Sequence, residues 1–265
     1  AHTPVVPVRP LQTFLDRLSS VWAEVTAQSS RRSWRVTVVG AGLGGIELAC
    51  TVPAYLVRHS PAGTHVDVRI VTRGTSLGHG LTARTTSRVL ASLTRRGIHV
   101  QFNTAVSAAA PGDADVLIWA GGAAAPPVLQ RLGLRVDDGG YAVVDATLAA
   151  SATPPIFVAG DAAGAGDTDG TRIPRAGVYA VRQAPILATN IRAVLDGRAM
   201  QPFVPQADFL KLINTGDGRA IGQWRGWSFE GRWAWWLKDA IDRRFMRQFP
   251  SSAASPATPQ PQSPR

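Results

Sequence analysis

A short glycine-rich turn limits the folds available to this chain more than any other feature of its sequence. The turn, G-A-G-L-G-G at residues 40–45, directly follows the apolar run at residues 35–39. A strand that passes through such a turn into a helix begins a βαβ unit. In this arrangement Gly40 makes the tight turn, Gly42 lets the backbone approach a pyrophosphate, and Gly45 lets helix and strand pack closely. The turn therefore predicts a dinucleotide site.

The backbone of this turn would hold the ligand. Ala41 and Leu43, together with the glycines, would place N–H groups at the positive end of the following helix, where a pyrophosphate is stabilised. The alternative is a glycine-rich turn that binds nothing. The position of the turn between a strand and a helix favours nucleotide binding over that alternative.

Apolar periodicity predicts the elements around the turn. Strands are expected at residues 35–39, 66–72, 99–102 and 115–119, and helices at 11–27, 43–58 and 85–96. Such alternation is typical of an α/β fold, here a Rossmann-like domain with a parallel sheet. Further along the chain, the sequence predicts short strands at 141–144 and 156–159 and a helix at 178–195.

These patterns divide the chain into five segments. We expect a connecting segment with an amphipathic helix at 1–33, an NAD(P)-binding domain at 34–122, part of a second domain at 123–202, a small Trp-rich α+β unit at 203–250 and a disordered tail at 251–265. The tail is assigned by its richness in Ser, Pro, Ala and Gln.

Composition and charge exclude several classes of protein. The 265 residues include 28 Lys and Arg against 18 Asp and Glu, a net charge of +10. The basic residues, nearly all Arg, are spread along the chain, which argues against nucleic-acid binding. A single cysteine excludes a disulfide scaffold and a CxxC pair within this chain. Since no apolar run approaches the ~20 residues of a membrane span and no signal pattern is present, we expect a cytoplasmic protein.

The end of the second predicted strand bears on the choice of coenzyme. It reads Val71-Thr72-Arg73-Gly74, without a carboxylate. NAD sites usually place Asp or Glu here for the ribose 2′-hydroxyl, whereas NADP sites use Arg against the 2′-phosphate. Thr72 and Arg73 therefore favour NADP(H). The alternative is that Arg73 is an ordinary solvated loop charge.

A second signature lies at residues 153–161, where a short apolar strand ends in Gly160-Asp161. A carboxylate at this position can accept hydrogen bonds from a polyol at the edge of the sheet. The alternative is a turn or N-cap aspartate.

Together the two signatures resemble those of the pyridine nucleotide-disulfide oxidoreductase superfamily, whose members bind FAD and NAD(P)H. The sequence W-A-G-G at residues 119–122, which contains Gly121, resembles the return from the NAD(P) domain to the FAD domain. Residues 39–49 are similar to the type II NADH dehydrogenases. Residues 174–183 and 232–245 resemble more specifically the flavoprotein module fused to selenide, water dikinases.

The resemblance, which covers about residues 5–249, implies roles for several residues. Asp161 would hydrogen-bond the ribityl chain and the pyrophosphate region of FAD. The helix that starts near Val178 and Tyr179 would direct its first N–H groups at the flavin, where reduction builds negative charge. Glu47 would face the contact between nicotinamide and flavin, or would only complement the dipole of its own helix.

Three departures from the family pattern affect these expectations. The family carries an earlier glycine-rich FAD loop that residues 1–34 lack, so we expect part of a longer protein, with 123–202 as the C-terminal half of the FAD domain. The redox-active cysteines are absent, which disfavours a disulfide reductase. Gln183 matches the second of two glutamines typical of quinone-reducing relatives, but Tyr179 replaces the first, which argues against a quinone acceptor.

A stripe of apolar residues recurs at helical spacing near the C-terminus: Trp233, Trp236, Leu237, Ala240, Ile241, Phe245 and Phe249. Such a stripe beside basic residues suits an interfacial membrane helix, and type II dehydrogenases dock on membranes through such segments. The favoured alternative is that the stripe packs against a small sheet around residues 210–221. Peripheral contact with the inner membrane through 233–249 thus stays open.

The sequence as a whole predicts an FAD-dependent NAD(P)H oxidoreductase that passes a hydride from nicotinamide to flavin and then to an unidentified acceptor, with quinone among the candidates. The alternative is a non-catalytic NAD(P)-binding or partner-binding module of a larger selenium-related or redox enzyme. The five histidines form neither a metal-spaced cluster nor a nucleophile pair. No metal site is expected, and the sequence assigns no catalytic residue and no oligomeric state.

Overall fold

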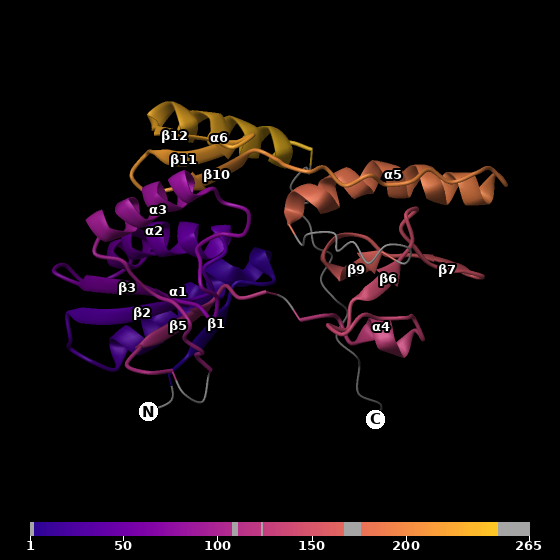
Figure 1. The fold of residues 1–265 in the computed structure, drawn as a ribbon. Helices are drawn as coiled ribbons and strands as arrows, with labels where there is room; N and C mark the ends of the chain where they lie inside the picture. Colours follow the sequence, from indigo (N-terminus) through magenta and orange to yellow (C-terminus); the bar gives the residue numbers. More distant parts are fainter. Residues whose placement is uncertain (1–2, 108–110, 123, 167–175, 249–265) are drawn as a thin grey trace, which may run out of the picture.

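The computed structural model describes residues 3–107, 111–122, 124–166 and 176–248, which form three parts (Figure 1). The predicted disordered tail at 251–265 lies outside these residues. No helix in the described ranges is long and apolar enough to cross a membrane.

The first part is a five-stranded parallel sheet with the order β1-β5-β2-β3-β4. Its strands are β1 (Val5–Pro7), β2 (Ser33–Val39), β3 (His65–Val71), β4 (His99–Gln101) and β5 (Val116–Trp119). The central strands β2 and β5 are rich in Val, Ile and Leu, as expected where both faces of a parallel sheet are covered. The predicted α/β fold is confirmed, and the four predicted strands are found within two residues of their expected bounds.

Three helices accompany this sheet: α1 (Phe14–Ala27), which follows the short turn η1 (Leu11–Thr13), α2 (Leu43–Arg58) and α3 (Ala83–Arg95). All three were predicted from apolar periodicity. Helix α1 is joined to α2 through a Ser19–Tyr55 hydrogen bond and to the residues just after α2 through a Trp22–Ser60 hydrogen bond. The ring of Trp22 also meets Trp34 of β2 edge to face, so α1 is part of the same core as the sheet.

Strand β1 was not predicted. Val6 in its centre is buried in one core with Phe14 and Leu18 of α1. Residues 5–27, which belong to the expected connecting segment at 1–33, therefore pack onto the parallel sheet. Three residues next to prolines contain no readable apolar alternation, which explains why the sequence did not reveal the strand.

The second part combines short strands with one long helix. Its elements are α4 (Val128–Arg131), β6 (Ala142–Val144), β7 (Ala149–Ala152), β8 (Pro155–Phe157), η2 (Gly160–Ala162), β9 (Ala163–Gly166) and α5 (Gly177–Leu195). Strand β6 pairs with β9 in parallel, and β7 pairs with β8 antiparallel. Helix α5 runs along one side of these strands (Figure 1). The predicted strands at 141–144 and 156–159 correspond to β6 and β8.

The third part is an antiparallel sheet of β10 (Lys211–Asn214), β11 (Ala220–Trp224) and β12 (Trp227–Gly231), followed by α6 (Arg232–Met246). It lies over α2 and α3, which separate it from the parallel sheet (Figure 1). Ile213 and Ile221 extend into the core of the first part. The C-terminal unit is thus fixed to the first part.

Candidate functional site

The glycine-rich turn has the backbone geometry that its sequence predicts. Gly40 has a φ of +116°, and its N–H donates to the Val71 carbonyl at 2.8 Å. A Cβ on Gly45 would lie 2.0 Å from the Gly40 carbonyl oxygen, and a Cβ on Gly40 would lie 3.0 Å from the Ala120 carbonyl and the Gly121 nitrogen. Gly40 and Gly45 are therefore required by the fold itself.

Gly42 is different, because the protein does not require a glycine there. Its φ of −66° suits any residue, and a Cβ on it would have no heavy atom within 4 Å. Gly42 is the N-cap of α2 and provides no side-chain hydrogen bond to the first turn, which contains Leu43. Open N–H groups at a helix start suit an anion. This cradle, which a side chain would fill, fits a dinucleotide pyrophosphate.

The end of β3 places the predicted coenzyme-selecting residues beside this cradle. Val39 of β2 pairs with Val71 of β3, so Thr72 follows at the same edge as Gly40. The Thr72 hydroxyl accepts a hydrogen bond from the Gly74 N–H at 3.1 Å. Arg73 is exposed at this edge.

Glu47 joins α2 to the C-terminal unit. Its Oε1 accepts the Asn214 N–H at 2.8 Å and lies 3.3 Å from Lys238 Nζ, which is itself 3.1 Å from Asp242. Burial by itself would lower the pKa of Lys238, but the Glu47 and Asp242 carboxylates raise it above its ordinary value. Sequence reasoning did not foresee these contacts.

The second signature forms a turn against α5. Gly160 has a φ of +68°, and its N–H donates to Gln183 Oε1 at 2.6 Å. The Gln183 side chain is 0% exposed, and its Nε2 has no hydrogen-bond partner among the described residues. Asp161 forms an ion pair with Arg9, which sequence reasoning missed because the two residues lie 152 positions apart.

Helix α5 starts next to this turn without a side-chain cap on its N-cap residue Ala176. Tyr179 is buried, its hydroxyl donates to the Gln206 carbonyl at 3.1 Å, and its ring meets Phe209 edge to face. The Gln183 Nε2, which lacks a partner among the described residues, and the first N–H groups of α5, which Ala176 does not cap, are polar groups that a flavin can satisfy. The residues present fit the cofactor that the sequence predicts.

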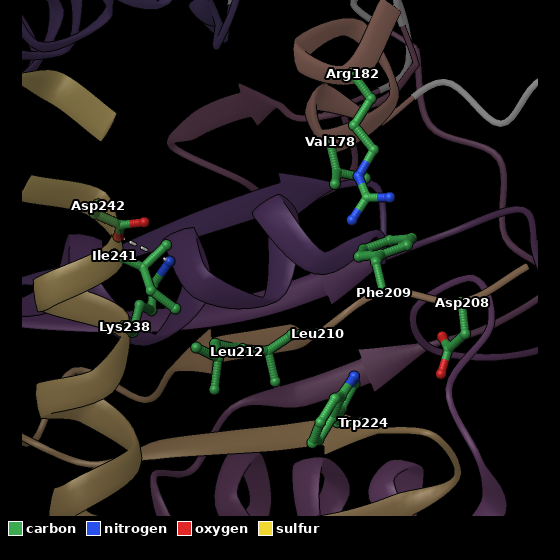
Figure 2. A pocket seen from close by; sticks show the side chains of 10 residues that line it. All are labelled: Val178, Arg182, Asp208, Phe209, Leu210, Leu212, Trp224, Lys238, Ile241 and Asp242. Atoms are coloured by element: carbon green, nitrogen blue, oxygen red, sulfur yellow. Dashed lines mark ion pairs between the residues drawn. The ribbon is translucent and has the colours of Figure 1, made fainter. Parts of the chain in front are cut away.

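A cavity of about 510 Å³ lies between α5, the segment before β10, and α6 (Figure 2). Its walls are mainly apolar and aromatic, and both helices add charged side chains. The residues that line it are Val178, Arg182, Asp208, Phe209, Leu210, Leu212, Trp224, Lys238, Ile241 and Asp242. Apolar walls with a few polar groups are typical of small-molecule pockets. Figure 2 shows Arg182 reaching into this space from α5, opposite Lys238.

The favoured interpretation of the α6 stripe, packing on the small sheet, holds for part of the stripe. Helix α6 packs on the β10–β12 sheet through the buried Ala234 and through Trp233, whose ring stacks on Phe229 of β12 with 4.8 Å between the ring centroids. Trp233 and Trp236 stay 56% and 61% exposed, and Leu237 and Ile241 are also exposed. The apolar period was correct, but it does not identify which side of the helix is covered.

Two kinds of site carry no support among the described residues. No group of three His, Cys, Asp or Glu side chains there could hold a metal ion. Cys50 is a free, buried thiol, and burial raises its pKa to about 11. A thiol with such a pKa is a poor nucleophile at neutral pH.

A glycine-rich turn at the carboxyl edge of a parallel sheet, followed at once by a helix, defines a fold of the Rossmann type. The sequence profile of the pyridine nucleotide-disulphide oxidoreductases matches residues 11–184, and the chain belongs to this family. This confirms the predicted superfamily.

Two relatives with curated names are a demethylphylloquinone reductase and a type II NADH:quinone oxidoreductase. The chain is 28% identical over 204 residues to the demethylphylloquinone reductase of Synechocystis sp., covering 71% of this chain and 49% of that protein. It is also 28% identical over 204 residues to the type II NADH:quinone oxidoreductase of Haemophilus influenzae, covering 71% and 46%. The chain thus spans about half the length of these relatives.

Solved structures show the same fold. The sulfide:quinone oxidoreductase of Aquifex aeolicus superposes with a TM-score of 0.71 at 16% identity, over 92% of this chain and 64% of that chain. NDH2 of Plasmodium falciparum, solved in complex with NADH, superposes with a TM-score of 0.70 at 12% identity, over 91% and 70%.

Proposed function

We propose that the chain is the nucleotide-binding part of a flavin-dependent NAD(P)H oxidoreductase. The observation that carries the proposal is Gly42: neither its φ nor its surroundings demand a glycine, so a ligand explains the residue best. Gly40, Ala41, Leu43, Gly45 and Gly121 would form the rest of the phosphate site. Residues 34–122 would be the nucleotide-binding domain, to which residues 5–27 add a strand and a helix.

Residues 123–202 would supply part of the flavin site. Gly160, Asp161, Gln183 and the first turn of α5, with Val178 and Tyr179, would hold FAD. When bound, FAD accepts a hydride from the nicotinamide and passes electrons onward. The uncapped N–H groups of α5 would stabilise negative charge that develops on reduction. Arg9 would keep Asp161 oriented through their ion pair.

The cavity between α5 and α6 is our candidate for the acceptor site. Its aromatic and apolar walls suit a flat, poorly hydrated acceptor such as a quinone, and the Lys238 ammonium would stabilise the reduced oxygen. Against quinone stands Tyr179, whose hydroxyl is already used by the Gln206 carbonyl. The acceptor class is therefore left to experiment, with quinone as the first compound to try.

We also propose that the exposed side of α6 touches the inner membrane from the cytoplasm. Trp233, Trp236 and Ile241 are exposed on this helix, and basic residues such as Arg243 and Arg244 stand beside them. Aromatic and basic side chains on one helix favour an anionic lipid surface. Residues 203–250 would then form the unit that holds the cavity near the membrane.

The test is a titration of the purified chain with NADPH and with NADH, in which nicotinamide fluorescence reports binding. We expect saturable binding of at least one coenzyme, and no binding by the Gly42→Val variant, since the valine fills the cradle. The same chain, which contains one glycine-rich phosphate loop, is expected to bind FAD weakly. A parent chain that binds neither coenzyme would contradict the proposed function, and stoichiometric flavin in the purified chain would contradict the expectation of weak FAD binding.

A second candidate is a non-catalytic nucleotide-binding or partner-binding module of a larger enzyme. The similarity of residues 176–183 and 232–245 to the flavoprotein module fused to selenide, water dikinases supports this candidate as well as the first. Residues 174 and 175 of that motif lie outside the described ranges. An activity assay separates the two candidates. With FAD present, only the oxidoreductase would reduce an added acceptor at the expense of NAD(P)H.

A further inference from the structure

Two buried polar side chains interrupt the apolar face of the C-terminal sheet. Lys211 of β10 and Gln223 of β11 are directly paired in the antiparallel register, so their side chains leave the sheet on the same face. Both are buried, with Gln223 only 3% exposed. Burying a polar side chain is costly unless its groups are bonded. Lys211 Nζ pairs with Asp208 at 2.6 Å, and Gln223 needs partners of its own.

Gln223 has its partners in the turn that precedes α3. Its Nε2 donates to the Gly80 carbonyl at 2.8 Å, and its Oε1 accepts the Thr82 N–H at 2.7 Å. Thr82 is the N-cap of α3. The alkyl stem of Lys211 lies beside the same turn, because a Cβ on Gly80 would be 3.6 Å from Lys211 Cε. The amide of Gln223 therefore holds this turn at two points, its middle and its C-terminal end.

The other side of this turn contacts the phosphate loop. The Gly78 N–H donates to the Ala41 carbonyl at 2.8 Å. A Cβ on Gly78 would lie 3.1 Å from Leu43 Cδ2, and Gly78 has a φ of +55°. Only three residues lie between Gly78 and Thr82, and Leu77 before them is buried in the core. The turn thus lies between Gln223 and the residues that would bind a pyrophosphate, and it is hydrogen-bonded to both.

We propose that Gln223 is a positioning residue for the nucleotide: by holding the 78–82 turn, it fixes Ala41 and Leu43 of the phosphate loop. Affinity for NAD(P)H then depends on a side chain of the C-terminal unit that never touches the nucleotide. The contacts form a continuous path of two hydrogen-bonded steps, from Gln223 to the turn and from the turn to Ala41. The proposal rests on the proposed function only where affinity is concerned.

The test compares variants of Gln223 in the full chain. Gln223→Leu removes both hydrogen bonds, and Gln223→Glu keeps the acceptor for Thr82 while losing the donor to Gly80. We expect Gln223→Leu to weaken NAD(P)H binding about fivefold, within the usual range of coupling between sites, and Gln223→Glu to weaken it less. If Gln223→Leu does not fold, the affinity of Gln223→Glu decides alone.

Two control variants separate positioning from simple loss of stability. Ser228→Ala changes the residue opposite Gln223 in β12, whose hydroxyl has no partner among the described residues. Ile221→Val destabilises β11 by removing a buried methyl group, and it leaves both side-chain hydrogen bonds of Gln223 in place. Both should bind NAD(P)H like the parent at a temperature where each variant is folded. Equal weakening by Ile221→Val, or parental affinity in both Gln223 variants, overturns the proposal.

Amide hydrogen exchange provides a readout that needs no ligand. In the absence of nucleotide, the amides of residues 41–45 should exchange faster in Gln223→Leu than in the parent and in Ile221→Val. Unchanged exchange at these residues overturns the positioning role. If the parent binds no NAD(P)H, the proposed function fails, and the exchange result still decides the role of Gln223.

Discussion

The ammonium of Lys238 lies 3.3 Å from the carboxylate of Glu47. This ion pair joins a wall of the cavity to α2, the helix that starts at the glycine-rich turn. Glu47 stands one turn after Gly42, and Lys238 lies on α6, almost 200 positions later in the chain. Both side chains are largely buried, with 22% of Lys238 and 27% of Glu47 exposed. The pair ties the candidate nucleotide site to the candidate acceptor site.

Replacing Lys238 with Met should lower the free energy of unfolding by about 1 kcal/mol, the upper range for a partly screened ion pair. The carboxylates of Glu47 and Asp242 would lose their shared cation. Lys238→Arg, which keeps the charge, should lose less. Urea denaturation at pH 7 measures both differences, and equal stability of all three proteins would contradict the prediction.

This stability difference should depend on pH in one direction. The neighbouring carboxylates hold the pKa of Lys238 above 10.5 in the folded protein, against the effect of burial. The stabilisation by the ammonium is therefore fully present below the unfolded pKa and is lost as the pH rises through the folded one. Between pH 6 and 9 the parent and Lys238→Met should differ by a constant amount, and above about pH 10.5 the difference should shrink.

Gly42 and Gly45 offer a matched pair of substitutions in one loop. Gly42→Val should abolish NAD(P)H binding and leave stability nearly unchanged, because a Cβ there meets no protein atom within 4 Å. Gly45→Ala should cost about 1–3 kcal/mol of stability, because its Cβ would lie 2.0 Å from the Gly40 carbonyl oxygen. Thermal unfolding and coenzyme titration of both variants test this. Unchanged NAD(P)H affinity in Gly42→Val would show that the loop is only a turn.

The parts of the fold that the sequence predicted are those with long, regular apolar patterns. Helix α2 was expected at 43–58 and spans Leu43–Arg58, because a glycine turn marks its start and period 3.6 continues through it. Strand β1, with three residues, has no such pattern. Its place in the sheet depends on Val6 entering a core built by α1, which is a long-range effect.

Site contacts were predictable only where the motif itself contains them. The close packing of Gly45 on Gly40 is local, and the motif predicted it. The ion pair of Arg9 with Asp161 and the hydrogen bonds of Gln223 with Gly80 and Thr82 join residues far apart in sequence. A single Gln in an apolar strand was the only available signal for Gln223.

The exposed side of α6 leads to a test of membrane contact. The parent protein should pellet with vesicles of anionic phospholipid in a cosedimentation assay. Trp236→Ser should weaken its affinity for the vesicles about tenfold, since burial of a large apolar side chain is worth roughly a factor of ten or more in affinity. Leu15→Ser on α1 is the control, because Leu15 is also exposed but lies in another part of the molecule. Parent protein that stays in the supernatant, or equal loss in both variants, would rule out a membrane role for this helix side.

Coenzyme preference is the sharpest remaining prediction. Thr72 and Arg73 lie at the edge of the sheet beside the phosphate loop, without a carboxylate in the position that NAD sites use. NADPH should therefore bind at least as tightly as NADH. Charge-assisted hydrogen bonds from Arg73 to a 2′-phosphate are worth about 1.5–3 kcal/mol. This corresponds to roughly tenfold or more in affinity. Because the site is exposed, added salt would reduce the gain in affinity. Arg73→Ala should weaken the binding of NADPH and leave the binding of NADH nearly unaffected. Arg58→Ala, at the far end of α2, is the control and should change neither affinity. If NADH binds the parent much more tightly, or Arg73→Ala changes neither affinity, Arg73 is an ordinary surface charge.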